Sequence, residues 1–277
     1  MRETRLSIAV TYALLIIGAL TIVLPLYMTA IIPFKTVAEN TASYFALPSR
    51  FNLDNFRTVL AGGRFFRALA NTAYITAFVL LGNAILMPML SYPIARSMHQ
   101  SPFYRFVYYF ILISIFIPFQ VKMMPLVKLL SSLRMMHPTG LSILYIASSI
   151  GESVFLYVGY MQSLPEELEA AAYIDGANTF QVYTRIVVPL VKPMMATALI
   201  RNGLWIWNDF LLPLIILNRS WTYWTLTLFQ YNFRTEYSID YSLTFAALVM
   251  SMIPIMLFYV FAQKHIVSGL TSGALKG

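Results

Sequence analysis

The sequence predicts an all-α integral membrane protein with six transmembrane helices. Of its 277 residues, 59% are hydrophobic and only 11% are charged, against about 25% charged residues in an average soluble domain. A soluble fold of this length could not cover so much apolar surface, and a disordered chain would be far more polar. The absence of Cys excludes disulfides, thiol chemistry and Cys-ligated zinc. The net charge of +8 favours contact with lipid headgroups over nucleic acid.

Long uncharged runs place the spans within a single domain, 1–277. A helix needs about 20 apolar residues to cross the hydrocarbon core, and three runs between charged residues exceed that length. The other three spans have charged residues within them or at their edges. The first run is too long for the apolar region of a signal peptide and is expected to stay as a span. The expected spans are approximately 7–32, 68–95, 104–124, 140–162, 190–217 and 241–263.

The segment 163–189 does not belong in lipid, because it holds four of the 11 acidic residues. Ser163 and Glu166 have the spacing of a capping box, which predicts a helix through an alanine run. Gly176 then permits a turn that a Cβ would resist. A second helix is expected at about 178–188, and Pro189 is expected to start the next span. Linking loops are usually shorter, so the segment is interpreted as a docking element.

Three stretches of the chain resemble one family. The first resembles the EAA loop of ABC importer permeases, the second a WNDF-type sequence of sugar permeases, and the third the C-terminal tail of MalG-like permeases. Shorter similarities at 47–56 and 70–72 extend the resemblance over nearly the whole chain. In order, the three stretches are Glu169-Ala170-Ala171 with Asp175-Gly176-Ala177, Phe180, Ile186, Pro189 and Pro193; Trp207-Asn208-Asp209-Phe210-Leu211 with Pro213; and HIVSGLTSGALKG at 265–277.

The resemblance implies a MetI-like ABC permease fold with a cytoplasmic coupling helix. Such a permease forms a heterodimer with a second homologous permease. An ATPase dimer, which would hold ATP and Mg, lies beneath the pair, and an extracytoplasmic solute-binding protein delivers the sugar. The chain itself lacks the GxxxxGK[ST] phosphate loop. It is therefore expected to be a transport subunit without a cofactor, and not an enzyme.

The resemblance also assigns two sets of residues to contact with the ATPase. In the loop 163–189 they are Glu166, Glu167, Glu169, Ala170, Ala171, Asp175, Gly176, Ala177, Phe180, Ile186 and Pro189. In the tail 264–277 they are Gly269, Gly273 and Lys276.

Polar residues at membrane depth are candidates for a translocation path, because a charge there costs about 2.5–3.5 kcal/mol on insertion scales. Helical spacing puts most of them on two adjacent stripes of the fifth span, suited to sugar hydroxyls and ring stacking. Alternatively, Arg201 and Asp209 pair with neighbouring subunits or with Glu152, or the WNDF-type residues only pack. Glu152 contacts either substrate or another subunit. The candidates are Glu152, Arg201, Asn202, Trp205, Asn208 and Asp209.

The loop 218–240 is rich in aromatic residues, which favours an interfacial belt. The resemblance adds a second interpretation, contact with the binding protein, through Trp221, Tyr223, Trp224 and Tyr231. The three His residues are far apart in the sequence, so no metal site is expected.

Orientation and substrate rest on the resemblance, which implies a multi-pass protein of the bacterial cytoplasmic membrane with both termini inside. That orientation leaves eight Lys and Arg inside and ten outside, contrary to the positive-inside rule. A neutral di- or oligosaccharide is the first expectation. An acidic saccharide or a sugar phosphate ester is the alternative, because of Arg201 and the basic outer face. An ion-coupled secondary transporter is less favoured, since no inverted repeat is visible.

Overall fold

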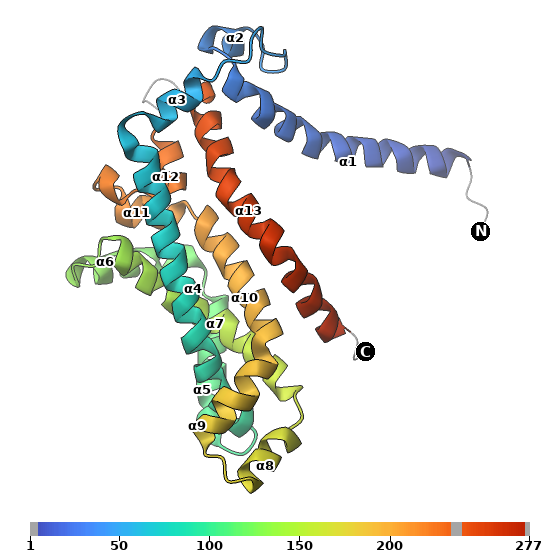
Figure 1. Ribbon diagram of the computed structural model, residues 1–277, viewed down its shortest axis with the longest axis vertical. Coiled ribbons are helices and arrows are strands. Elements are labelled where there is room, and N and C mark those ends of the chain that lie inside the picture. The colour runs from blue at the N-terminus through green and yellow to red at the C-terminus, as the bar shows by residue number, and fades with distance from the viewer. Residues whose placement is uncertain (1–4, 234–239, 275–277) are drawn as a thin grey trace. The chain divides into compact units, whose positions relative to one another are not determined.

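The computed structural model describes residues 5–233 and 240–274, whose regular secondary structure is helical, with no strand among them (Figure 1). The chain divides into two units, Met1–Arg67 with Leu228–Pro254, and Ala68–Thr227 with Ile255–Gly277. Short 3-10 helices occur at Ile32–Phe34 (η1), Ala61–Gly63 (η2) and Trp221–Tyr223 (η4), and η3 (Tyr183–Val187) is a π-helix. The α-helices are α1 (Arg5–Ile31), α2 (Val37–Ala42), α3 (Asp54–Leu60), α4 (Arg64–Ser97), α5 (Pro102–Phe116), α6 (Phe119–Ser132), α7 (Pro138–Gln162), α8 (Glu167–Ile174), α9 (Thr179–Val182), α10 (Val188–Asn208), α11 (Leu211–Leu217), α12 (Leu226–Tyr231) and α13 (Tyr241–Ala274).

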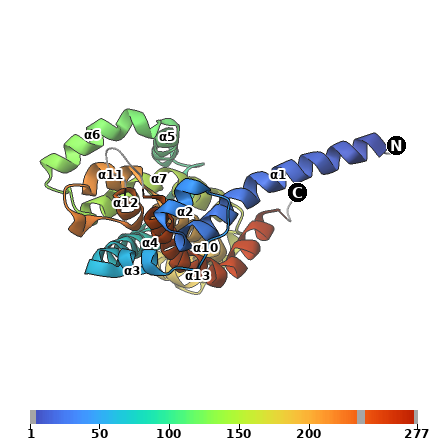
Figure 2. The same ribbon diagram turned by 90° about the horizontal axis from the view of Figure 1, so that it is seen from above.

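Five helical stretches of the described chain are long and apolar enough to cross a membrane, and α5 with α6 makes a sixth if the bent pair is one span. The expected span 104–124 is therefore not one straight helix. The pair bends by 103° where Ile117 is extended (φ −81°, ψ 112°), and Figure 2 shows α6 leading away from the end of α5. Pro118 causes the break, because proline lacks the backbone donor and disfavours helical backbone in the residue before it.

The fifth span also differs from expectation at both ends. Helical backbone is continuous from Thr179 through η3 into α10, so Pro189 does not start a separate helix. It lies where the π-helix η3 gives way to α10, a position at which the regular helical hydrogen bonding is already interrupted. At the other end α10 stops at Asn208, since Asp209 is extended (ψ 134°), and α11 follows as a separate short helix. The expected span 190–217 is thus a longer helix, a break and a short helix.

At the C-terminus, α13 continues through the expected tail. Gly269 and Gly273 both lie within this helix, which runs to Ala274. Lys276 lies outside the described residues.

The core of the second unit is centred on α7, which packs against α5 and α10. Tyr157, Val158 and Met161 of α7 are buried with Ile94 of α4 and Val191 of α10. Each is an apolar or aromatic side chain on an inward face, as tight helix packing requires. The coupling segment α8–α9 lies at one end of this unit and α11 at the other (Figure 1).

A compact loop follows α1 in the first unit. Lys35 is fully buried, and its Nζ donates to the carbonyls of Ser43 (2.9 Å) and Tyr44 (3.2 Å). Thr36 and Glu39 form a capping box at the start of α2. Glu39 also accepts hydrogen bonds from the hydroxyl and the backbone N–H of Ser49. These bonds fold the loop back on itself.

Glu39 is expected to make this loop sensitive to acid. The hydrogen bond from the Ser49 hydroxyl, followed by those from backbone N–H groups, lowers the pKa of Glu39 from 4.5 to about 2. A lowered carboxylate pKa contributes stability above its unfolded value, here 4.5, which is lost as the pH falls through about 2. The thermal unfolding temperature of wild type should therefore fall between about pH 5 and about pH 2 by more than that of Glu39→Gln. Equal pH dependence of the two proteins would show that the hydrogen bonds do not stabilise the charged form.

Candidate functional site

The coupling segment begins differently from the predicted capping box. Ser163 belongs to the end of α7, where its hydroxyl donates to the Tyr160 carbonyl at 2.7 Å. Glu166 occupies the N-cap of α8 without a side-chain cap. The box occurs instead at α9, where Asn178 and Gln181 exchange two bonds of 2.9 Å. The sequence carried this second signal, an Asn followed three residues later by Gln.

Gly176 has the conformation that the turn prediction required. Its φ is +84°, a region that residues with a Cβ rarely adopt. It follows α8, and the Ala177 N–H donates to the Ala172 carbonyl at 2.9 Å, which closes the turn. This glycine therefore reverses the chain between α8 and α9.

The predicted coupling residues are mostly on the surface. Phe180 is a large apolar side chain with an exposed fraction of 73%, and Ile174, which was not among the predicted residues, is 86% exposed. Ala177 and Ile186 are half-buried. Between the two helices lies a hollow of about 380 Å³, lined in part by Asp175, Gly176 and Arg185. The exposed members of the predicted set are Glu166, Glu167, Ala170, Ala171, Asp175, Gly176, Phe180 and Pro189.

Glu169 is the exception, because it is buried and faces α4. Its Oε1 accepts from Arg96 Nε (2.9 Å) and Nη2 (2.6 Å), and its Oε2 accepts from the Tyr92 hydroxyl (2.7 Å). Arg96 also donates to the Met161 carbonyl at 2.8 Å, near the end of α7. We call Tyr92, Arg96 and Glu169 the α8 clamp. Sequence analysis missed its α4 half, although a Tyr and an Arg four residues apart share one helix face.

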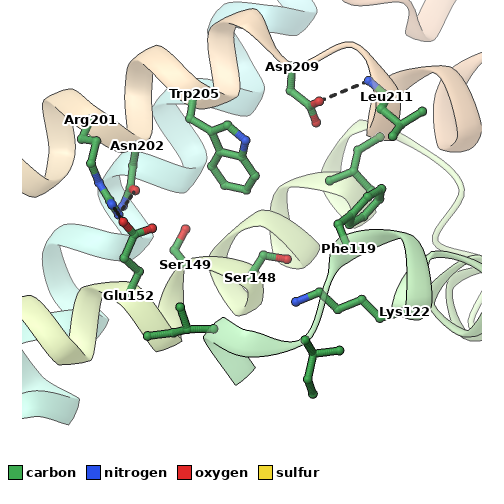
Figure 3. A pocket seen from close by; sticks show the side chains of 13 residues that line it. Phe119, Lys122, Ser148, Ser149, Glu152, Arg201, Asn202, Trp205, Asp209 and Leu211 are labelled. Atoms are coloured by element: carbon green, nitrogen blue, oxygen red, sulfur yellow. Dashed lines mark hydrogen bonds and ion pairs between the residues drawn. The ribbon is translucent and has the colours of Figure 1, made fainter. Parts of the chain in front are cut away.

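A polar cavity of about 590 Å³ lies in the second unit beside the α5–α6 break (Figure 3). Its walls come from α5, α6, α7, α10 and α11. Five of the six candidate path residues line it, and Asn208 does not. Asn208 donates to the Leu204 carbonyl at 2.8 Å and is exposed. The lining residues are Ile115, Ile117, Phe119, Lys122, Ser148, Ser149, Glu152, Arg201, Asn202, Trp205, Asp209, Leu211 and Leu212.

Arg201 and Glu152 form an ion pair at one end of the cavity. This is one of the alternatives that the sequence left open for these residues. Arg201 Nη2 also lies 3.4 Å from the Asn202 side-chain oxygen. Two buried donors in this cluster, Arg201 Nε and Asn202 Nδ2, have no hydrogen-bond partner among the residues that the structure describes. The cluster therefore has unsatisfied capacity to donate hydrogen bonds.

Asp209 is held at the other end of the cavity, just past α10. Its carboxylate accepts from the Tyr145 hydroxyl at 2.6 Å and from the Leu211 N–H at 3.2 Å. The Tyr145 ring also meets the Trp205 indole edge to face, with centroids 5.3 Å apart. Tyr145 therefore fixes two candidate path residues at once. No pattern in the sequence predicted this role, because Tyr145 lies on another helix.

A family model of the "binding-protein-dependent transport system inner membrane component" matches residues 84–272. The chain belongs to this family. It is a multi-pass membrane component of a transport system and not an enzyme, and the resemblance to ABC sugar permeases of the MalG-like type is confirmed.

Individual relatives and solved structures agree with this family. The multiple sugar-binding transport system permease protein MsmG of Streptococcus mutans is 40% identical over 99% of both chains. The probable starch degradation products transport system permease protein AmyC of Thermoanaerobacterium thermosulfurigenes is 33% identical over 91% of both. A crystal structure of a bacterial ABC transporter involved in import of the acidic polysaccharide alginate covers 95% of this chain and 98% of its own, with a TM-score of 0.81 and 22% identity. That likeness confirms the ABC permease fold.

The aromatic residues assigned to a binding-protein contact fall into both units of this permease. Trp221 and Tyr223 are exposed on η4, and Tyr231 is exposed at the end of α12 in the first unit. Trp224 is half-buried, and its carbonyl accepts from Asn71 at 3.0 Å. Among the described residues no three His, Cys, Asp or Glu side chains gather into a metal site.

Proposed function

We propose that this permease is one subunit of an ATP-driven, binding-protein-dependent importer of di- or oligosaccharides, and that it forms half of the translocation pathway. Family membership and the sugar systems named for the relatives support the substrate class. One structural observation carries the role of the chain. The coupling segment presents Ile174 and Phe180 to the outside while Glu169 fastens it to α4. Movement of a partner bound to these exposed side chains can therefore displace the segment and, through Glu169, the membrane spans.

The remaining partners complete the proposal. A second homologous permease forms the heterodimer, and an ATPase dimer binds ATP and Mg and takes the exposed residues of α8 and α9 into its surface. Gly269, Gly273 and Lys276 of the C-terminal segment provide a second contact with the ATPase. A solute-binding protein docks outside, near Trp221 and Tyr223. Both termini lie on the cytoplasmic side of a bacterial cell membrane.

Two connections would carry movement from the ATPase into the spans. The α8 clamp links the coupling segment to α4, and the continuous helix from α9 through η3 leads into α10. Both α4 and α10 contribute to the buried core, and α10 lines the polar cavity. Closure of the ATPase dimer would therefore change the access to the cavity, which is alternating access biased by ATP.

Gly176→Val with Gly62→Val as its matched control tests this coupling. Both glycines have positive φ (84° and 75°) and open space at the Cβ position, so each substitution should cost a similar 1–2 kcal/mol, roughly, in backbone strain. Only Gly176 lies in the coupling segment. Gly176→Val should abolish ATPase stimulation by the loaded binding protein, and Gly62→Val should keep it. Both variants should insert into the membrane.

Equal stimulation in the two variants would refute a coupling role for the segment. A vesicle assay addresses the energy source separately. Sugar uptake that survives ATP depletion and collapses with an uncoupler would replace this proposal with the ion-coupled alternative.

A further inference from the structure

We propose that the polar cavity of this chain binds a neutral saccharide ring, with Trp205 as its stacking surface, and disfavours an acidic one. This inference rests on the proposed function. It adds that this subunit itself contacts the sugar and selects it by charge. A cavity of about 590 Å³ lies within the range of about 300–1,000 Å³ that is usual for small-molecule sites.

The charges around the cavity balance. Its ionisable residues are two cations, Lys122 and Arg201, and two anions, Glu152 and Asp209. Arg201 is paired with Glu152, and Asp209 accepts hydrogen bonds while facing the open space (Figure 3). A carboxylate on the ligand would meet Lys122 but also the two carboxylates of the wall, so it gains no net attraction to offset the loss of its hydration.

Hydroxyl groups suit this wall better than carboxylates. Each hydroxyl both donates and accepts, whereas an ionised carboxylate only accepts. Asp209 offers acceptor oxygens at one end, and the Lys122 ammonium points into the cavity as a donor from α6 (Figure 3). A neutral sugar can satisfy both, because it carries donors and acceptors around one ring.

Trp205 provides the apolar surface that a sugar ring needs. Its side chain projects into the cavity (Figure 3) and is 43% exposed. The Tyr145 ring holds it from the side in an edge-to-face contact, which restricts the indole to one orientation. A large aromatic face of fixed orientation packs against the C–H face of a pyranose at low entropic cost.

Asn202 supplies an independent indication of a ligand. It is only 3% exposed and lines the cavity, yet within the described part of the chain neither its Nδ2 nor Arg201 Nε beside it has a hydrogen-bond partner. Buried donors without acceptors cost free energy. A sugar oxygen that enters when the Arg201–Glu152 pair opens would provide the missing acceptor.

The test is ligand-observed NMR, by saturation transfer, on the full chain in lipid nanodiscs. Maltotriose is the neutral probe and trigalacturonate the acidic one. Wild type should bind maltotriose more tightly than trigalacturonate. Trp205→Ala should weaken the binding of maltotriose about tenfold, the equivalent of about 1.4 kcal/mol. Asn202→Leu should also weaken this binding. Phe155→Ala is the matched control, because Phe155 is a half-exposed aromatic of α7 outside the cavity lining, and it should bind as wild type does.

Charge selection is tested with Glu152→Gln, which leaves the cavity with a net positive charge. Its preference should shift toward trigalacturonate. The inference is overturned if wild type binds neither probe, if it prefers trigalacturonate, or if Trp205→Ala binds maltotriose normally. Uptake by the assembled importer separates this result from the proposed function. Saccharide uptake without binding in this cavity refutes only the inference, whereas the absence of any saccharide uptake refutes the proposed function.

Discussion

Arg96→Ala is expected to disconnect the coupling segment from α4 and to abolish ATPase stimulation. The Arg96 and Glu169 side chains are 13% and 9% exposed, and the shorter of their contacts is 2.6 Å. Removing one partner of a buried ion pair leaves an uncompensated charge, which costs about 3–5 kcal/mol. The loss should appear as a lower unfolding temperature of the purified chain. In the assembled importer, basal ATPase activity should persist without stimulation by the loaded binding protein.

Two controls separate the clamp from a general effect of removing an arginine. Arg105→Ala removes an exposed Arg of α5 whose described hydrogen bonds go to the carbonyls of Met98 and His99. It should retain nearly full stability and stimulation. The charge swap Arg96→Glu with Glu169→Arg should recover part of the stability lost in either single variant. If Arg96→Ala has the unfolding temperature and the ATPase stimulation of wild type, the α8 clamp contributes neither to stability nor to coupling.

Gly151→Leu is expected to force α5 and α7 apart beside the cavity. A Cβ at Gly151 would lie 2.5 Å from Ser114 Oγ and 3.1 Å from Ile115 Cγ1. Overpacking a tight contact costs about 1–3 kcal/mol, so the unfolding temperature should fall. Because Ile115 lines the cavity, sugar uptake should fall with it.

Gly159→Leu is the matched control on the same helix. Apart from the local backbone of its own helix, no described atom lies within 4 Å of the Cβ position of Gly159, and replacing a helical glycine gains up to about 1 kcal/mol. This variant should be as stable as wild type or slightly more stable. Equal destabilisation of the two variants would show that the close contact of α5 and α7 at Gly151 does not limit stability.

The sequence predicted those features that depend on neighbouring residues. Uncharged length located the long helices, because crossing a hydrocarbon layer is a property of one continuous segment. Gly176 was predicted as a turn for the same reason, since a positive φ is a local preference. Pro118 indicated a break between α5 and α6, but the prediction of one span at 104–124 did not take this proline into account.

Contacts between distant segments could not be predicted in the same way. Arg96 and Glu169 are separated by 73 positions in the chain, and Tyr145 reaches Asp209 across 64. The sequence shows that such residues are polar in an apolar setting, and therefore need partners. The choice among partners follows from helix packing, which placed Glu169 inward and excluded Asn208 from the cavity.

The bend at Ile117 decides on which side of the membrane everything after it emerges. With 15 and 14 residues, α5 and α6 are each about 21–23 Å long, so neither alone crosses a hydrocarbon core of about 30 Å. If the pair crosses together, the number of crossings is even, and the coupling segment shares a side with both termini, as the proposed ATPase contacts require. If the pair turns back, the number is odd, and the two termini emerge on opposite sides. The topology of the whole chain thus depends on one proline-induced break.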